Sequence, residues 1–386
     1  MTNTADVVII GGGVQGASLA FHLAQRGVKV VVIEKQFIGA GATGRSSGLV
    51  RMHYDLEVDS RLAWESFKYF RNWKALIGGD CGFTRTGFIQ IAGIALEDAL
   101  QENIKMHQRI GIPELLISAD DVKRLAPSFL TDDFNFASYE PESGYASPVD
   151  TANSLMTAAR SLGAQLIQGS AVTAIRVASG KIVGVDTTQD SYSAAVVVNV
   201  AGAWAGKINQ MVEVDIPYTT WRHDTMFVRR PAEVGLSHPT VIDFSTEMYF
   251  RPEGELTLVG LEDGNPLGQS PDTDPSQALT GFVERAIDRI CQRVPIMEQS
   301  SLHSAHGGYD GITPDQHAIL GAIGPDGFYV NCGHSGTGFK TAPAVGLCMS
   351  ELILDGQSRT VDISSMTPHR FTTGALIRGN YRDMWK

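Results

Sequence analysis

The pattern that most constrains the fold of this chain is a run of glycines between two short apolar segments. Residues 7–10, Val-Val-Ile-Ile, have the length and β-branched character of a buried parallel strand. The run 11–16, Gly-Gly-Gly-Val-Gln-Gly, follows at once and leads into apolar residues at helical spacing that end before Gly27. Residues 28–33 form a second apolar run, which Glu34 closes. Strand, glycine loop, helix, strand and acid in this order predict a dinucleotide-binding unit.

The three glycines of this Gly-x-Gly-x-x-Gly pattern have separate roles in such a unit. Gly11 permits a tight turn, Gly13 lets a pyrophosphate approach the backbone, and Gly16 lets the helix pack closely on the strand. The first turn of the helix offers free N–H groups and partial positive charge to the phosphates. Glu34 stands 18 residues after Gly16, where an acid accepts hydrogen bonds from a ribose. The alternative is a glycine-rich turn that binds no nucleotide.

A second loop, rich in glycine and hydroxyl residues, favours one dinucleotide over another. It covers residues 39–48, Gly-Ala-Gly-Ala-Thr-Gly-Arg-Ser-Ser-Gly, shortly after Glu34. Simple nicotinamide-dependent units usually continue into a helix here, whereas this loop adds backbone donors for a longer cofactor with phosphates. We therefore expect FAD rather than NAD, with a flexible surface loop as the alternative.

Charge and composition exclude several classes of function. The chain has 386 residues, with 31 Lys and Arg against 42 Asp and Glu and a net charge of −11 at pH 7. Nucleic acids and anionic membranes bind clustered basic residues, so neither is an expected partner. No run has the roughly 20 apolar residues of a membrane span, and the first residues lack the basic region of a signal peptide. Because the four cysteines form no Cys-x-x-Cys pair, we expect reduced thiols and a cytoplasmic protein.

The remaining pattern predicts a fold of the α/β (α+β) class. Residues 194–204 and 327–333 are apolar runs that end in glycine turns, and we expect the first in the same sheet as the N-terminal strands. Residues 217–261 alternate in four short runs typical of antiparallel strands, and residues 274–294 are expected to form a helix. We therefore predict a Rossmann-type FAD-binding domain with an inserted antiparallel-sheet substrate domain.

The expected domains are built from discontinuous segments. The FAD-binding domain comprises residues 1–80, 141–212 and 303–365. The substrate domain comprises residues 81–140 and 213–302, and residues 366–386 form a C-terminal tail without a clear pattern.

Five segments together resemble the D-amino-acid oxidase superfamily of FAD enzymes, with a closer likeness to sarcosine oxidases and dimethylglycine dehydrogenases. They are the fingerprint 11–34, the loop 41–45 (Gly-Ala-Thr-Gly-Arg), and the segments 198–204 (Val-Asn-Val-Ala-Gly-Ala-Trp), 313–321 (Thr-Pro-Asp-Gln-His-Ala-Ile-Leu-Gly) and 333–340 (Gly-His-Ser-Gly-Thr-Gly-Phe-Lys). The resemblance implies a two-domain fold in which an antiparallel sheet covers the flavin. It is thin in residues 81–140 and 217–300, where substrate choice is made.

The resemblance also implies a carboxylate-binding pair, Arg51 and Lys340, because these residues match the positions that hold the substrate carboxylate in monomeric sarcosine oxidase. A guanidinium fork and an ammonium charge suit a carboxylate in a dry cleft. The alternatives are a surface ion pair for Arg51 and a solvated residue at a helix start for Lys340. A cation in the first turn of a helix opposes the helix dipole, which favours a functional reason for Lys340.

Further candidates for the substrate pocket are Tyr249, His223, Tyr309 and His334, although each alone is more typical of a packed residue. His303 and His306 are close, yet no acid or Cys stands at a metal-ligand offset, so we expect no metal site. The expected FAD contacts are Gly11, Gly13, Val14, Gln15, Gly16, Glu34, Lys35, Gly41, Ala42, Thr43, Arg45, Ser46, Ser47, Gly48, Leu49, Val172, Ala201, Gly202, Trp204, Gly307, Gly333, Ser335, Gly336, Thr337, Gly338, Phe339 and Lys340.

Three positions depart from the pattern of the family that the chain resembles. Gly308 stands where sarcosine oxidases often carry a flavin-linking Cys, and Arg45 stands where dimethylglycine dehydrogenases carry a flavin-linking His. We therefore expect non-covalent FAD. Leu258 is the best match to the Lys that activates oxygen in monomeric sarcosine oxidase, so an electron acceptor other than oxygen is plausible.

The implied reaction is oxidation of the C–N bond of a small secondary or N-methylated amino acid. Hydride transfer to flavin N5 would give an imine that water hydrolyses. Three alternatives stay open: a D-amino-acid dehydrogenase, the flavin subunit of a larger amine-oxidising complex, and an assembly protein that keeps FAD without catalysis. The net charge of −11 disfavours a tRNA-modifying role.

Overall fold

The computed structural model describes residues 3–235 and 237–381. A six-stranded sheet lies at the centre of one half of the molecule. All its neighbouring strands are parallel except the last pair, which is antiparallel. The strand expected near residue 200 lies beside the N-terminal strand, which confirms the predicted shared sheet. In spatial order the strands are β10 (Gln165–Ile167), β3 (Val30–Ile33), β2 (Val7–Ile10), β14 (Val196–Asn199), β21 (Phe328–Cys332) and β20 (Ile319–Ala322).

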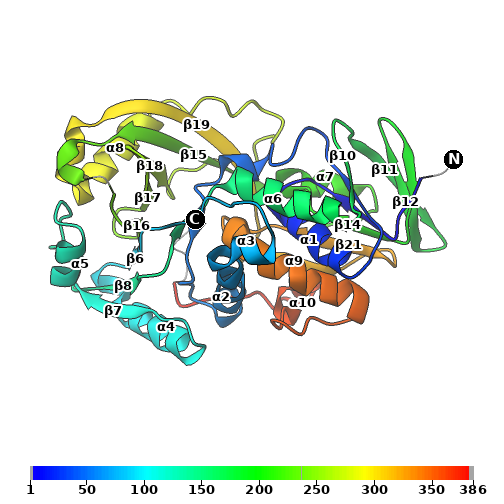
Figure 1. Ribbon diagram of the computed structural model, residues 1–386, viewed down its shortest axis with the longest axis horizontal. Coiled ribbons are helices and arrows are strands. Elements are labelled where there is room, and N and C mark those ends of the chain that lie inside the picture. Colours follow the sequence, from blue (N-terminus) through cyan, green and yellow to red (C-terminus); the bar gives the residue numbers. More distant parts are fainter. Residues whose placement is uncertain (1–2, 236, 382–386) are drawn as a thin grey trace.

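This sheet is buried on both faces, which explains its continuous apolar runs. Val7, Ile9, Val30 and Val32 share a core with helices α1 (Val14–Gln25), α2 (Glu57–Arg71), α6 (Pro148–Ser161) and α9 (Gly338–Asp355). The residues that alternate with them pack against α7 (Ala205–Gln210) and a small sheet at one end of the molecule (Figure 1). Its strands are β1 (Asn3–Thr4), β13 (Ser191–Ser193), β12 (Lys181–Thr187) and β11 (Val172–Ala178).

Helices α1 and α9 come from opposite ends of the sequence and lie side by side (Figure 1). Ser18 Oγ donates to the carbonyl of Ala342 at 2.7 Å, and His22 Nε2 hydrogen-bonds the carbonyl of Pro343 at 3.0 Å. Burial lowers the pKa of His22 to about 4, so the ring is neutral at physiological pH. These contacts fix the start of α9 relative to the start of α1, which matters because both helix starts reach the same cavity.

An eight-stranded sheet forms the other half and joins segments far apart in the sequence (Figure 1). Its neighbours are antiparallel, as predicted for residues 217–261, except for one parallel pair between β16 and β6. In order the strands are β19 (Ser301–Ile312), β15 (Thr219–Arg229), β18 (Leu256–Leu261), β17 (Met248–Glu253), β16 (Thr240–Asp243), β6 (Phe88–Ile91), β8 (Phe136–Glu140) and β7 (Leu115–Ser118).

The remaining elements are short or peripheral. A three-stranded sheet consists of β4 (Leu49–Val50), β9 (Gly144–Tyr145) and β5 (Thr84–Arg85). The other helices are α3 (Trp73–Leu76), α4 (Glu97–Arg109), α5 (Ala119–Leu125), α8 (Phe282–Arg293) and α10 (Arg370–Thr373), and the 3-10 turns are η1 (Ala42–Arg45), η2 (Ile94–Leu96), η3 (Gly202–Trp204), η4 (Ala232–Val234), η5 (Pro295–Gln299) and η6 (Ser364–Met366). Within residues 3–235 and 237–381, no helix combines the length and the apolar character that crossing a membrane requires.

The two sheets and their helices confirm the predicted α/β class, while two local predictions were wrong or incomplete. The helix expected over residues 274–294 begins only at Phe282, because Gly281 adopts a left-handed conformation with φ of 80°. Strand β19 was not predicted, since its first four residues are exposed and three glycines follow, so no alternation of apolar residues marks it. The predicted domain boundaries stay a prediction.

Arg293 on α8 ties that helix to the eight-stranded sheet and gives a test of this architecture. Its guanidinium is 1% exposed and donates to Asp243 at 2.7 Å and to Asp133 at 2.7 and 2.8 Å. Arg293→Ala leaves the buried Asp243 unpaired, so we expect a loss of about 3–5 kcal/mol in the free energy of unfolding, measured by urea denaturation.

The matched control is Arg229→Ala, which breaks an exposed pair with Glu255. We expect that variant to lose less than about 1 kcal/mol. Equal losses in the two variants would contradict the role given to Arg293.

Candidate functional site

A cavity of about 780 Å³ is lined by residues from both halves of the structure. The six-stranded sheet contributes the loops that follow β2, β3, β14 and β21. The eight-stranded sheet contributes residues of β15, β16, β17 and β19 and the residue that follows β18. In open parallel sheets, ligands bind beyond the carboxyl ends of the strands. The glycine loops that the sequence singled out therefore lie at the expected edge.

Glu34 and Thr43, two of the polar residues expected to contact the cofactor, hold the first glycine loop. Glu34 accepts hydrogen bonds from the N–H of Gly12 at 2.7 Å and of Gln36 at 2.8 Å. Thr43 Oγ1 accepts from the N–H of Val14 at 3.0 Å, which links the second loop to the start of α1. Both loops thus form one wall of the cavity.

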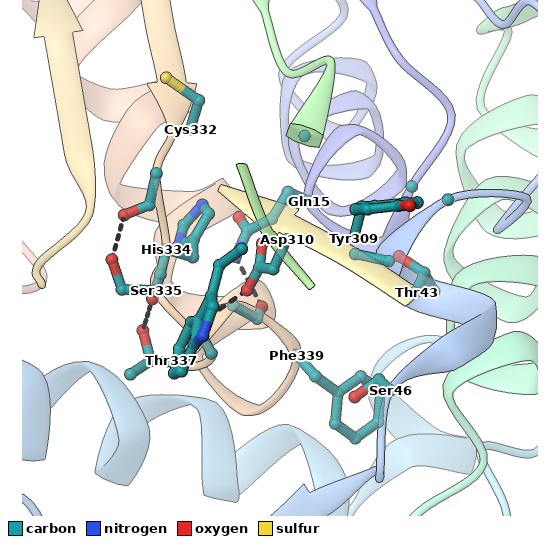
Figure 2. A pocket seen from close by; sticks show the side chains of 18 of the residues that line it. Gln15, Thr43, Ser46, Tyr309, Asp310, Cys332, His334, Ser335, Thr337 and Phe339 are labelled. Carbon is teal, nitrogen blue, oxygen red and sulfur yellow. Dashed lines mark hydrogen bonds between the residues drawn. The ribbon is translucent and has the colours of Figure 1, made fainter. Parts of the chain in front are cut away.

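The turn after β21 also lines the cavity and is tied to the first glycine loop. Figure 2 shows His334, Ser335 and Thr337 along this turn, with Gln15 and Asp310 beside them. Gln15 Nε2 donates to the carbonyl of Gly338 at 2.7 Å, and Asp310 accepts from the N–H of Gly336 at 2.8 Å. These contacts place the first turn of α9, and with it Lys340, against the cavity.

Arg51 and Lys340 both line the cavity, and each is 8% exposed. The Arg51 guanidinium donates to the carbonyl of His53 and lies 4.2 Å over the centre of the Tyr54 ring. Lys340 Nζ donates to the carbonyl of Gly336 at 3.2 Å. Neither cation has an ion-pair partner among the residues that the structure describes, which contradicts the alternatives of a surface ion pair and a solvated helix start.

Burial changes the protonation of Lys340. It lowers the pKa of Lys340 to about 7, and the neighbouring Arg51 guanidinium acts in the same direction. The Glu262 and Asp310 carboxyl groups oppose the shift without abolishing it. An anionic ligand between the two cations would therefore be stabilised by both and would favour the charged form of Lys340.

The segment that carries Arg51 is held by a buried polar network that the sequence did not predict. His53 Nδ1 hydrogen-bonds Glu114 at 2.5 Å, and His107 Nδ1 hydrogen-bonds the other oxygen of the same carboxylate. The Met52 N–H donates to Glu140 at 3.0 and 3.1 Å. Glu140 satisfies the backbone N–H that follows Arg51, and Glu114 holds the ring of His53 two residues further on, so the two carboxylates fix the position of Arg51.

The same network bears on the expectation of no metal site. His53, His107 and Glu114 offer metal-ligating atoms that lie within 4.8 Å of one another. Both Nδ1 atoms are engaged with the carboxylate, and the Nε2 atoms hydrogen-bond Tyr381 at 2.7 Å and the carbonyl of Tyr54 at 2.7 Å. Every ring nitrogen thus has a protein partner, and we interpret the group as a hydrogen-bonded support of the pocket.

The other four pocket candidates line the same cavity, and two of their ring nitrogens have no partner among the described residues. These candidates are Tyr249, His223, Tyr309 and His334. Burial lowers the pKa of His334 to about 4 and of His223 to about 3, so both rings are neutral at physiological pH. His334 Nε2 hydrogen-bonds Asn331 at 2.8 Å, whereas its Nδ1 has no partner.

Two further parts of the lining were missed in the sequence. Glu262 stands just after β18 and lines the cavity. Residues 376–379 and Tyr381, from the predicted patternless tail, also line it, and the Tyr381 N–H donates to Asp55 at 2.9 Å. No local pattern marks either feature, because each becomes part of the site only through contacts with distant segments.

Most predicted FAD contacts line the cavity, and three do not. Gly16, Gly48 and Gly307 are absent from the lining. Gly16 serves close packing instead, since a Cβ there would lie 2.1 Å from the carbonyl oxygen of Gly11. A Cβ on Gly307 would meet the Asp224 carboxylate at 2.4 Å, so this glycine faces a neighbouring ion pair.

The two positions associated with covalent flavin attachment are adjacent in this structure. Gly308 and Arg45 both line the cavity, and a Cβ on Gly308 would lie 2.6 Å from Cβ of Arg45. Leu258 is 2% exposed and packs in an apolar cluster with Tyr249 rather than lining the cavity.

The cavity fits the dinucleotide that the sequence predicts. Its volume is within the range of about 300–1,000 Å³ that is common for ligand sites. Five buried atoms on lining residues have no hydrogen-bond partner in the described part of the chain: Arg51 Nε, Tyr54 Oη, Ser170 Oγ, His223 Nε2 and His334 Nδ1. Because buried polar groups are normally hydrogen-bonded, these atoms indicate a polar ligand in the cavity.

Comparison with known proteins gives consistent matches. A family model described as FAD dependent oxidoreductase matches residues 6–352. Mitochondrial sarcosine dehydrogenase of Mus musculus is 28% identical over 396 residues, which cover 96% of this chain and 42% of the relative. The chain thus spans about two fifths of the length of that protein.

Two other relatives match over nearly their whole length. Glycine oxidase of Geobacillus kaustophilus (strain HTA426) is 28% identical over 364 residues, covering 92% of this chain and 94% of the relative. The solved structure of L-proline dehydrogenase from P. horikoshii has a TM-score of 0.90 and 26% identity, covering 97% of this chain and 99% of that chain.

The position of Glu34 gives a test of the cofactor site. Glu34→Ala removes a charged acceptor from the cavity and from the glycine loop, so we expect FAD to bind at least tenfold more weakly, since hydrogen bonds to charged groups contribute about 1.5–3 kcal/mol. The dissociation constant is measured from the fluorescence of free flavin. Glu65→Ala, on the surface of α2, should leave it unchanged, and an unchanged value in Glu34→Ala would contradict the assignment.

Proposed function

The chain belongs to the family of FAD dependent oxidoreductases, and we propose that it oxidises the C–N bond of a small secondary or N-methylated amino acid. The observation that carries this proposal is the pair of buried cations, Arg51 and Lys340, without an ion-pair partner in the described residues of the cavity. A buried cation is costly unless an anion is near. A substrate carboxylate would supply that anion.

The residues of the chain bind, orient and enclose the substrate. Arg51 offers a fork of N–H donors and Lys340 a single charge, and together they fix a carboxylate at two points. Tyr249 on β17 and the turn after β21 bound the remaining space. Bound FAD supplies a hydride acceptor, flavin N5. The protein holds the hydrogen-bearing carbon of the substrate toward it in a site that excludes water.

The names of the matched relatives support a small amino acid as the substrate, because each name contains one. Sarcosine, glycine and L-proline are small amino acids in which a carboxylate and an amine flank one carbon. We propose the same arrangement for the substrate of this chain. A D-amino-acid dehydrogenase, a flavin subunit of a larger complex and a non-catalytic FAD-binding protein stay alternatives, and a cytoplasmic location stays a prediction.

We further propose non-covalent FAD and an electron acceptor other than oxygen. Gly308 offers no atom for attachment, and a side chain there would collide with Arg45. Leu258, the best match in the sequence to the oxygen-activating Lys of monomeric sarcosine oxidase, is apolar and buried. Flavin should therefore leave the protein on acid denaturation, and reduced flavin should reoxidise slowly in air.

The experiment that tests the function is the visible flavin spectrum during anaerobic addition of sarcosine, dimethylglycine, L-proline, hydroxyproline, glycine and several D-amino acids. We expect bleaching by at least one secondary or N-methylated amino acid. Bleaching by D-amino acids alone favours the D-amino-acid dehydrogenase, and no bleaching by any member contradicts the proposed function. Arg51→Ala should raise the substrate concentration for half-maximal bleaching at least tenfold with FAD retained, whereas Arg71→Ala, on the surface, should not.

Carboxylate binding should depend on pH in a direction set by Lys340. Its ammonium is charged below a pKa of about 7 and loses its proton as pH rises through that value. The affinity for tetrahydrofuran-2-carboxylate, an amine-free analogue of proline, should therefore fall as pH rises above about 7. The measurement is the perturbation of the flavin spectrum between pH 5.5 and 9.

Lys340→Met is the matched variant for this profile. It should bind the analogue weakly, with a flatter dependence on pH around 7, because the titrating charge is gone. The same decline in wild type and Lys340→Met would assign the dependence to another group.

A further inference from the structure

We propose that Glu262 is the proton acceptor for the substrate, taking a proton from its ammonium nitrogen before the C–N bond is oxidised. This inference rests on the proposed function and extends it by naming the group that prepares the amine. A neutral amine is needed because only its nitrogen lone pair can assist the departure of a hydride from the adjacent carbon.

The sheet places Glu262 on the cavity side. Tyr249 on β17 pairs with Gly260 on β18, and a Cβ on Gly260 would lie 2.2 Å from the Tyr249 ring. The ring of Tyr249 therefore lies over Gly260, on the face of the sheet that borders the cavity. Alternate residues of a strand share a face, so Glu262 follows Gly260 to that side. Its N–H donates to the carbonyl of Glu247 at 2.9 Å, which fixes its backbone.

The acidic residues of the lining differ in whether their carboxyl groups are already engaged. Six of them accept hydrogen bonds or form ion pairs with protein groups: Glu34, Asp55, Asp59, Asp272, Asp310 and Asp315. Among the described residues, the Glu262 carboxyl group accepts no hydrogen bond and forms no ion pair. Glu262 is thus the acid of the lining that is open to a ligand.

The charges around Glu262 suit a zwitterion. Lys340, Arg51 and Asp263 act on it electrostatically, and Tyr249, His223 and Asp310 also line the cavity. Burial raises the pKa of the Glu262 carboxyl group to about 8, against the opposing effect of the two cations. The free group is therefore largely protonated at pH 7, but the substrate ammonium beside it is a further cation and favours its ionised form. The carboxylate that accepts the proton is thus present when the zwitterion is bound.

The proton balance of the step is simple. One N–H bond of the ammonium breaks, the electron pair stays on nitrogen, and the proton forms an O–H bond with the Glu262 carboxylate. The substrate then carries a neutral amine and a carboxylate held by Arg51 and Lys340. Glu262 returns its proton to water after the product leaves.

The first test measures binding without turnover. The probes are 2-aminoisobutyrate, which has no hydrogen on the carbon that bears the amine, and isobutyrate, its amine-free counterpart. Wild type should bind 2-aminoisobutyrate at least tenfold more tightly than isobutyrate, judged from the flavin spectrum. Glu262→Gln should lose this preference and bind isobutyrate within about twofold of wild type, while Glu284→Gln, exposed on α8, should keep the preference.

The second test separates proton transfer from simple charge pairing. In anaerobic mixing with a substrate that bleaches the flavin, Glu262→Gln should reduce flavin at least tenfold more slowly at pH 7. Its rate should then rise about tenfold per pH unit, because only amine that is already neutral in solution reacts. Glu262→Asp should restore part of the rate at pH 7.

The outcomes distinguish this proposal from the proposed function. If wild type binds neither probe and no amino acid bleaches its flavin, the proposed function fails and this inference fails with it. If wild type is bleached by an amino acid but Glu262→Gln keeps both its amine preference and its rate at pH 7, the proposed function stands and the role of Glu262 is overturned.

Discussion

Two cations share one buried cavity without a carboxylate committed to either, and the surrounding structure is organised to keep them there. Arg51 follows β4 and Lys340 stands in the first turn of α9, nearly 300 residues later in the chain. Each would be more stable in water unless an anion joined it. Burying the two cations costs free energy, which contacts elsewhere in the fold offset. The paired helices α1 and α9 hold Lys340, and the network of His53, Glu114 and Glu140 holds Arg51. A site of this kind is held ready for an anion rather than formed by it.

The two halves of the molecule contribute differently to the cavity, because one is built on a mostly parallel sheet and the other on a mostly antiparallel sheet. The parallel sheet places its glycine loops along one edge, where backbone N–H groups and helix starts suit a dinucleotide. The eight-stranded sheet contributes a wall in which the absence of a side chain at Gly260 makes room for the ring of Tyr249. The cavity lies between them, so residues of both halves must meet for it to exist.

The sequence predicted the parts of the fold and of the cavity that depend on a local pattern of residues. The βαβ unit, the cavity loops and the antiparallel run over residues 217–261 each have a period or a glycine spacing that any reader can find. Arg51 and Lys340 came from a resemblance, since a lone Arg and a lone Lys have no pattern of their own. Glu262, the His53 network and Tyr381 were missed because their roles exist only once distant segments meet. Strand β19 was missed for a different reason, its exposed and glycine-rich sequence.

The most direct test of the account is a crystal structure of the FAD-loaded protein with tetrahydrofuran-2-carboxylate bound. The account predicts carboxylate oxygens within about 3.2 Å of the Arg51 guanidinium and of Lys340 Nζ, and the ring of the analogue between the flavin and the eight-stranded sheet, with its oxygen toward Glu262. A carboxylate bound elsewhere in the cavity, with Arg51 and Lys340 still without an anion, would contradict it.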